Sequence, residues 1–309
     1  MPWKQVTEIY DLLDNSKVTA SSVKDFLLSC GLKDQEVKTK RVEEEKGFTE
    51  FIKIKLKGQG RRAGKTPTLG IIGRLGGIGA HPHTTGLVSD ADGALTALAG
   101  ASKLADMRRN GDILPGDIII STHISPASPI IPHEPVSFMG SPVSMEIMNQ
   151  EEVDPAMDAI LSVDTTKGNR IINHKGFAIS PTVKDGYILR VSEDLLDIMQ
   201  IVTGRLPAVF AVTTQDIIPY GKKIYHLNSI MQPATATHSP VVGVAITTET
   251  AVPGCATGAN HCLDIEMAVR FCLEVAKAFG KGKCSFYDEE EFRLLKKLYG
   301  SLEHLKIQK

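Results

Sequence analysis

The stretch TLGIIGRLGGIGA (residues 68–80) decides the fold class of this 309-residue chain. It begins as a continuous apolar run, typical of a β-strand buried on both faces, and then enters a glycine-rich loop. A long helix is predicted after this loop, because alanine and leucine recur at helical spacing over residues 94–111. A buried strand followed by a helix is the repeating unit of a parallel sheet. The stretch therefore predicts an α/β fold.

Similar patterns continue on both sides of this stretch. Two short helices and a half-buried strand at residues 51–58 are predicted before it. Further buried strands are predicted at residues 117–125, 158–166, 206–216 and 241–250, and further helices at residues 192–205 and 263–280. We expect one α/β domain over residues 1–309, a three-layer α/β/α sandwich with a largely parallel or mixed central sheet. Its parts would be N-terminal helices and an edge strand (1–66), a core (67–285) and a C-terminal helix (286–309).

The composition excludes a disordered, collagen-like or coiled-coil protein. Hydrophobic residues make up 42% and charged residues 23%, as in ordinary globular proteins. The net charge of −1 creates no overall field for nucleic acid or an anionic membrane. The N-terminus lacks the pattern of a signal peptide, and five cysteines, an odd number, indicate reduced thiols. We expect a cytoplasmic protein with no nucleic-acid or membrane partner.

Polar residues that follow the buried strands are the candidates for function, because ligands of open parallel sheets bind beyond the carboxyl ends of the strands. His123 and Asp164 each lie near the end of such a strand. Asp164 needs a partner, since an unpaired buried carboxylate is costly, and a cation, a metal or amide donors would serve. Thr122, Asn169 and Glu249 lie in comparable positions and are candidates for substrate binding.

The loop HPHTTGLVSDADG (residues 81–93) holds the densest group of polar side chains. His81, His83, Asp90 and Asp92 have the side chains that bind zinc and similar divalent metals. Two alternatives stay open: either aspartate can cap the following helix, and the histidines can lie exposed. Asp92 and His123 are the candidate catalytic residues. His261, just before the helix at 263–280, is a candidate metal ligand or a packing residue.

No nucleotide or redox cofactor is indicated. The segment GQGRRAGKT (residues 58–66) has the wrong glycine spacing for a phosphate-binding loop, and Pro67 with a strand follows instead of a helix. The sequence also contains neither a nucleophile elbow nor a dinucleotide fingerprint. A divalent metal, zinc or a similar ion, is the one cofactor that the residues suggest.

Two phrases carry a resemblance to known proteins. GRLGGIGAHPHTTGLVSDADGA (residues 73–94) and AILSVDTTKGNRI (residues 159–171) resemble the family known as domain of unknown function 1177. More distantly, the order of elements over residues 5–280 is similar to that of the dinuclear zinc aminopeptidases. This second resemblance implies two metals that share a bridging carboxylate, and a glutamate that acts as general base on the bridging water.

Position by position, most ligands of that metal centre are replaced. Arg74 stands at the first histidine, and an arginine cannot bind a cation. Thr122 and His123 stand at the Glu-Glu pair, so the general base is missing. Asp164 matches a metal-binding aspartate, and Ser89 or Asp90, depending on the register, falls at the bridging one. The resemblance therefore implies the fold without the usual two-zinc chemistry.

Two hypotheses follow. In the first, the protein is a hydrolase-like enzyme for an amino-acid-derived amide or small peptide, with one rebuilt metal site. Its metal ligands would be Asp90, Asp164 and His123, with His81, His83 or His261 as a further ligand. In the second, it is a metal-free binding or regulatory protein in which Arg74 grips a ligand carboxylate and Asp164 or Asp90 takes its ammonium. A homo-oligomer is expected by analogy with peptidase folds and from the apolar PIIP segment (residues 129–132).

Overall fold

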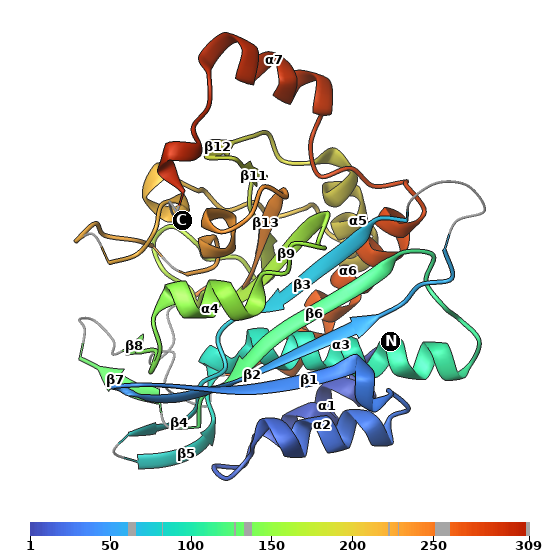
Figure 1. Cartoon of the computed structure of the whole chain (residues 1–309), viewed down its shortest axis with the longest axis vertical. Coiled ribbons are helices and arrows are strands. Elements are labelled where there is room, and N and C mark those ends of the chain that lie inside the picture. Colours follow the sequence, from blue (N-terminus) through green and yellow to red (C-terminus); the bar gives the residue numbers. More distant parts are fainter. Residues whose placement is uncertain are drawn as a thin grey trace.

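A nine-stranded sheet forms the centre of the computed structural model (Figure 1). The structure describes residues 1–60, 66–81, 83–126, 128–132, 138–221, 223–227, 229–250 and 260–306, without the side chains of 79–81, 83–85, 130 and 138. The strand order is β1-β2-β6-β3-β9-β13-β11-β12, and β10 also pairs with β13. The four strands β6, β3, β9 and β13 are mutually parallel, and the other pairings are antiparallel.

The bounds of these strands are β1 (Val37–Glu44), β2 (Gly47–Leu56), β3 (Thr68–Gly73), β6 (Asp117–Ile124), β9 (Ala159–Thr165), β10 (Gly176–Ile179), β11 (Val183–Lys184), β12 (Tyr187–Ile188) and β13 (Val241–Thr247). The parallel strands are buried on both faces, as their apolar runs predict. In β3, Ile71 faces the larger core cluster and Ile72 faces the second one. Adjacent residues of one strand thus reach opposite layers.

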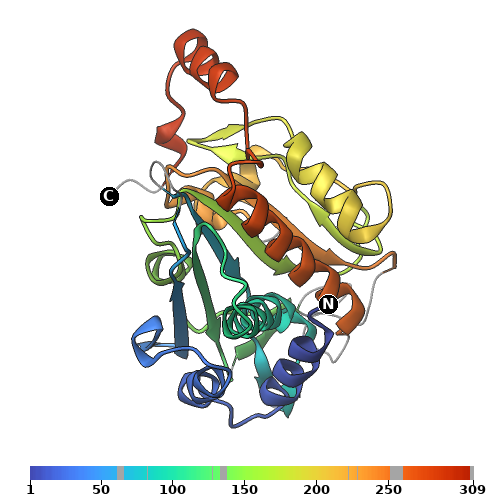
Figure 2. The same ribbon diagram turned by 90° about the vertical axis from the view of Figure 1, so that its right-hand side faces the viewer.

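Helices cover both faces of this sheet. On one face α3 and α6 pack together, with α1 and α5 beside them (Figure 2). On the other face lie α4 and the segment that supplies Phe210, Ile230 and Met231 to the second core. The helices are α1 (Trp3–Leu13), α2 (Ala20–Ser29), α3 (Asp92–Arg109), α4 (Met145–Glu152), α5 (Glu193–Thr203), α6 (Cys262–Gly280) and α7 (Glu289–Tyr299). The predicted fold class, a mixed α/β sheet flanked by helices, is confirmed.

A smaller sheet of four strands, in the order β5-β4-β7-β8, lies beside the main one. Its strands are β4 (Ile78–His81), β5 (His83–Leu87), β7 (Ser128–Ile131) and β8 (Phe138–Met139). The PIIP segment lies largely in β7, where the exposed fraction of Ile131 is 39%. None of the helices that the structure describes is long and apolar enough to cross a bilayer.

Two local predictions need correction. Residues 206–216 do not form a strand, since only Val209 makes a bridge, to Ile179. Pro207 lies in this segment, and Phe210 is buried in the second core, so the apolar residues cover the sheet instead of extending it. The helix α4 was not predicted, although Ser144 caps it by accepting a hydrogen bond from the Ile147 amide.

The direction of chain crossing changes between β3 and β9. From β3 the chain passes through α3 to β6 on one side, whereas β9 and β13 lie on the other side. Ligands of open α/β sheets bind at such a point, beyond the carboxyl ends of the strands. At this point the beginning of α3 lies against the backbone at the ends of β3 and β9. A Cβ atom on Gly93 would lie 1.8 Å from the Arg74 carbonyl oxygen and 2.6 Å from the Val163 carbonyl oxygen. Only glycine fits at this contact.

Candidate functional site

Arg74 follows β3 directly and is fully buried. Its Nε donates to Glu152 Oε2 at 2.7 Å, and Nη2 donates to Asn149 Oδ1 at 2.6 Å. Both acceptors are buried on α4, and Asn149 is itself bound to the carbonyl of Gln232. The guanidinium is thus enclosed by groups of its own chain. In this arrangement Arg74 holds Glu152, and the expected grip on a ligand carboxylate would require this ion pair to open.

His123, near the end of β6, completes this buried network. Its Nδ1 lies 2.5 Å from Glu152 Oε1, and its Nε2 accepts from the Gly76 amide at 3.2 Å. Because Nε2 accepts from the Gly76 amide, the contact at Nδ1 is a donation to Glu152. Burial by itself would raise the pKa of Glu152, but the charge of Arg74 and the hydrogen bond from His123 hold that pKa below its ordinary value.

Asp164, the sixth residue of β9, is buried at the same edge of the sheet. Ser229 Oγ donates to its Oδ2 at 2.7 Å, and the Thr165 amide donates to its Oδ1 at 2.7 Å. Burial raises the pKa of Asp164 to about 7, although these two hydrogen bonds and the charge of Arg74 favour the ionised form. The carboxyl group therefore exchanges its proton near neutral pH.

The segment that supplies Ser229 is fastened to the body by buried side chains. Asp216 accepts from the amides of Thr213 and Leu227 at 2.9 and 3.0 Å. Gln232 Nε2 donates to the Ile218 carbonyl at 2.8 Å. Tyr220, whose ring stacks on His226 with centroids 4.1 Å apart, has a pKa raised by burial and by the charges of Asp164 and Asp216. These contacts hold Ser229 beside Asp164.

Asp92 forms a second ion pair where α3 begins. Its Oδ2 accepts from Lys167 Nζ at 2.8 Å and its Oδ1 from Asn260 Nδ2 at 2.5 Å. Burial raises the pKa of Asp92, and Lys167 opposes that rise. Two buried polar atoms nearby, Thr166 Oγ1 and Asn260 Oδ1, have no hydrogen-bond partner among the described residues. Such atoms are available to a bound polar molecule.

Neither Asp90 nor Asp92 occupies the N-cap position of α3, which was the alternative to metal binding. The residue that caps α3 is Ala91, with no side-chain cap bond, and Asp92 is the first helical residue. Asp90 is buried in the short 3-10 helix Ser89–Ala91 that precedes α3. The carboxylate of Asp92 still lies in the first turn, where negative charge is favoured by the helix dipole.

The remaining candidates lie around this edge of the sheet. Thr122 is buried and its hydroxyl donates to the Gly73 carbonyl at 2.8 Å, while Asn169 accepts from the Ile171 and Ile172 amides of its own turn. Glu249 is exposed just after β13. His261 precedes α6 with its Nδ1 3.3 Å from Asp264 Oδ2. The side chains of His81 and His83 lie outside the described residues.

The potential metal-ligating atoms of His123, Asp164 and Asp92 do not fit a divalent metal in this arrangement. Both nitrogens of His123, both oxygens of Asp164 and both oxygens of Asp92 are engaged with protein groups, and Arg74 and Lys167 add positive charge. Among described residues, the group whose ligand atoms lie within 4.8 Å of one another is Asp185, His238 and Glu303. Asp185 already pairs there with Lys306 at 3.4 Å and Lys296 at 3.8 Å. A metal at the strand ends would therefore depend on the other predicted ligands, Asp90, His81, His83 and His261.

We expect purified protein to carry well under one transition metal per chain at the strand ends. The reason is that the carboxylates of Asp92 and Asp164 and the imidazole of His123 are already engaged by protein groups. Elemental analysis before and after exhaustive chelation, on the parent and on Asp164→Ala, measures this. One metal per chain that chelation removes and that Asp164→Ala lacks would contradict the expectation.

Four residues of this site were missed by sequence reasoning. Glu152 and Asn149 lie on the unpredicted helix α4, and Ser229 lies far along the chain from Asp164. The spacing between Asn149 and Glu152 places both on one helix face, which is a signal once the helix is known. Lys167 lies three residues after Asp164, and its pairing with Asp92 joins positions 75 residues apart.

Comparisons with known proteins agree on the fold. The cytosol aminopeptidase of Coxiella burnetii aligns with a TM-score of 0.50 and 14% identity, over 90% of this chain and 68% of that one. The leucine aminopeptidase LAP1 of Caenorhabditis elegans aligns with a TM-score of 0.49 and 14% identity, over 87% of this chain and 65% of that one. At such identity the first likeness shows the fold alone.

No curated protein sequence matches the chain. Residues 40–309 match the family described as "Protein of unknown function (DUF1177)", a span that runs from within β1 to the last residue and includes Arg74, His123, Glu152 and Asp164. The chain therefore belongs to this family.

Proposed function

We propose that this protein is a hydrolase-like enzyme for amides derived from amino acids or for small peptides, with Asp164 as its acid–base group. The observation that carries the proposal is the buried Asp164 carboxyl, with a pKa of about 7, at the point where chain crossing changes direction. Proton transfer is most efficient when the pKa of the catalytic group lies near the working pH. The similarity in fold to a cytosol aminopeptidase supports the same class of substrate.

The neighbouring groups would divide the remaining tasks. Asp164 would accept a proton from water as the water oxygen attacks the amide carbon, and would return it to the amine nitrogen as the C–N bond breaks. Lys167 and the amino end of α3 would favour the negative charge that develops on the carbonyl oxygen. Thr166 Oγ1 and Asn260 Oδ1 would bind polar groups of the substrate. Arg74, Glu152 and His123 act as positioning residues under this proposal.

The test is turnover of a panel of amino-acid amides and dipeptides by the full chain. Asp164→Asn is expected to lower kcat/KM about 10²–10⁴-fold, the range for loss of a general acid–base group. Asp117→Asn, at the opposite end of the parallel strands, is the matched control and should keep the parent rate. The parent rate should change with pH near 7, and Ser229→Ala should move that change to higher pH, because Ser229 favours the ionised carboxylate.

A parent that turns over no member of the panel, or an Asp164→Asn variant with the parent rate, would contradict the proposal. A metal-free binding or regulatory protein is the second candidate, and it is favoured by the engagement of the strand-end groups His123, Asp164 and Asp92 with protein partners, which leaves no described ligand set for a catalytic metal among them. In that case the same compounds would raise the Tm of the parent without turnover, and Asp164→Asn would lose the shift.

A further inference from the structure

The helix α7 projects from the body of the molecule near the carboxyl end of the described chain (Figures 1 and 2). Its buried residue is Phe292, whose ring meets Tyr187 edge-on at 5.9 Å and Tyr287 at 5.5 Å. Lys296 also pairs with Asp185, at 3.8 Å between Nζ and Oδ2. The inner side of α7 is therefore attached to the body at defined points.

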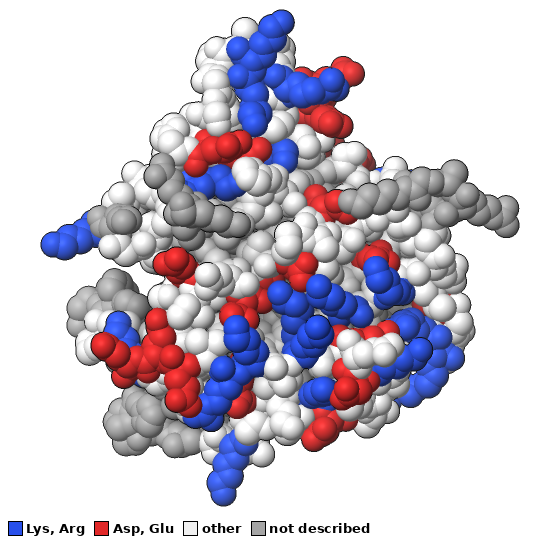
Figure 3. Space-filling view, in the orientation of Figure 1, with Lys and Arg blue, Asp and Glu red and all other residues white. Residues whose placement is uncertain are grey.

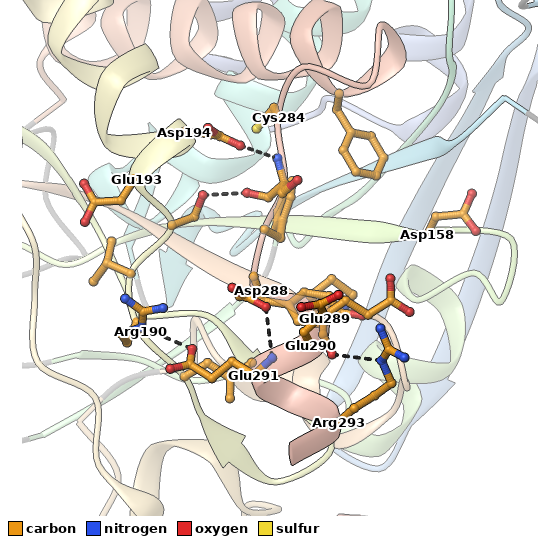
Figure 4. A pocket seen from close by; sticks show the side chains of 18 residues that line it. Asp158, Arg190, Glu193, Asp194, Cys284, Asp288, Glu289, Glu290, Glu291 and Arg293 are labelled. Carbon is orange, nitrogen blue, oxygen red and sulfur yellow. Dashed lines mark hydrogen bonds and ion pairs between the residues drawn. The ribbon is translucent and has the colours of Figure 1, made fainter. Parts of the chain in front are cut away.

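A groove separates the first turn of α7 from the beginning of α5 (Figure 4). Its volume is about 710 Å³, and the ion pair from Arg190 Nε to Glu291 Oε2, at 3.1 Å, crosses it. The acidic side chains on its walls lie largely in the first turns of α5 and α7, where the helix dipole stabilises negative charge. The α7 helix is therefore separated from the beginning of α5 by this groove and is connected across it by the Arg190–Glu291 ion pair.

The outer side of α7 carries large apolar residues without cover among the described residues. The exposed fractions are 54% for Leu294, 60% for Leu298 and 71% for Tyr299. Leu294 and Leu298 are four positions apart, so they form one stripe along the helix. In the space-filling view, basic and acidic side chains lie on this helix beside uncharged surface (Figure 3). A contiguous apolar stripe with a charged border is typical of a protein–protein contact.

A second exposed apolar surface lies on α5. Ile201 is 80% exposed and Leu206 is 85% exposed, and both line a shallow cavity of about 600 Å³ with Asp197, Gln200 and Arg205. Ile201 lies eight residues beyond the first residue of α5, about 12 Å along the axis. The α7 helix of the same chain is attached near the other end of α5, where Arg190 pairs with Glu291.

The charges that border the two surfaces are complementary in one orientation. On α7 the acid Glu290 precedes the stripe and the base Lys297 lies near its end, whereas on α5 the acid Asp197 comes first and the base Arg205 last. Antiparallel packing would pair Glu290 with Arg205 and Lys297 with Asp197. Glu290 and Lys297 are seven residues apart, about 10.5 Å along α7. Asp197 lies within α5, Arg205 lies two residues beyond its last residue, and both line the same cavity.

We propose that α7 of one copy docks antiparallel onto the α5 surface of a second copy. Leu294 and Leu298 pack against Ile201 and Leu206 in this contact, and the two charge pairs set its direction. The contact is proposed in its reciprocal form, in which a two-fold axis places α7 of each copy on the α5 surface of the other and closes the assembly as a dimer. The partner is thus a second copy of this chain.

Light scattering and sedimentation equilibrium of the full chain test the proposal. We expect the parent to have twice the chain mass of 33.5 kDa. Leu294→Glu/Leu298→Glu and Ile201→Glu/Leu206→Glu are each expected to be monomeric, with the circular dichroism of the parent. Ile171→Glu, at a side chain that is 56% exposed away from both surfaces, is the matched control and should stay dimeric.

A charge exchange tests the direction of packing without changing the apolar residues. Glu290→Arg and Arg205→Glu should each raise the dimer Kd severalfold, and the double variant should restore it. A monomeric parent at micromolar concentrations would overturn the proposal. A dimer that both glutamate pairs leave intact, or a double variant no better than the single ones, would also overturn it.

Discussion

Replacing Glu152 with alanine is expected to lower the free energy of unfolding by about 3–5 kcal/mol. Glu152 is fully buried and accepts from Arg74 Nε at 2.7 Å and from His123 Nδ1 at 2.5 Å. Its removal leaves the guanidinium as an uncompensated buried charge and leaves the imidazole N–H without its acceptor. The cost of a buried charge without a partner is much larger than the value of a surface pair.

Glu151→Ala is the matched control, because Glu151 is the adjacent residue of α4 and pairs with Lys40 at the surface. We expect this control to cost about 0–1 kcal/mol. Urea unfolding at pH 7, with equal slopes for the parent and both variants, measures the difference. Arg74→Met/Glu152→Leu should recover part of the loss, since it removes both charges together. Equal costs for the Glu152 and Glu151 variants would contradict the assignment.

The stability of the parent is expected to fall as pH rises from about 4 to 7, through Asp164. Burial raises the pKa of this carboxyl group to about 7, against an ordinary value near 4. Between these values the folded chain keeps a proton that the unfolded chain has released, so each pH unit upward disfavours folding. At 1.36 kcal/mol per unit, three units amount to about 4 kcal/mol. This contribution is complete below pH 4 and is lost by pH 7.

Asp164→Asn removes one of the two described carboxyl groups with raised pKa and should make this dependence shallower between pH 5 and 7, and the raised pKa of Asp92 accounts for a remaining fall in the same direction. The amide oxygen can still accept from the Thr165 amide, and Ser229 Oγ can accept from the amide nitrogen, so the local contacts are kept. The lowered pKa of Glu152 acts in the opposite direction, and its stabilisation is lost only as pH falls below about 4.5. Asp117→Asn should follow the parent profile. A parent whose stability is constant from pH 5 to 7 would refute the raised pKa.

Sequence reasoning predicted those residues of the candidate site that lie at the ends of strands. Asp164 and His123 were found because a polar residue at the end of a buried apolar run has few explanations other than function or pairing. Arg74 was singled out in the same way, because it directly follows a buried strand, but the sequence did not indicate which residue pairs with it. Glu152 lies 78 residues further along, on a helix hidden by the proline-rich sequence before it. No local pattern reports an ion pair between positions so far apart.

The sequence by itself determined the α/β class and the parallel strands, and it predicted a candidate site at their carboxyl ends. These follow from local periodicity, which requires no knowledge of distant residues. Only the tertiary structure decided what the polar residues do there. It paired Arg74 with Glu152, Lys167 with Asp92 and Ser229 with Asp164. Burial and such long-range partners set the charge and the pKa of each group, and both depend on which segments the folded chain brings together.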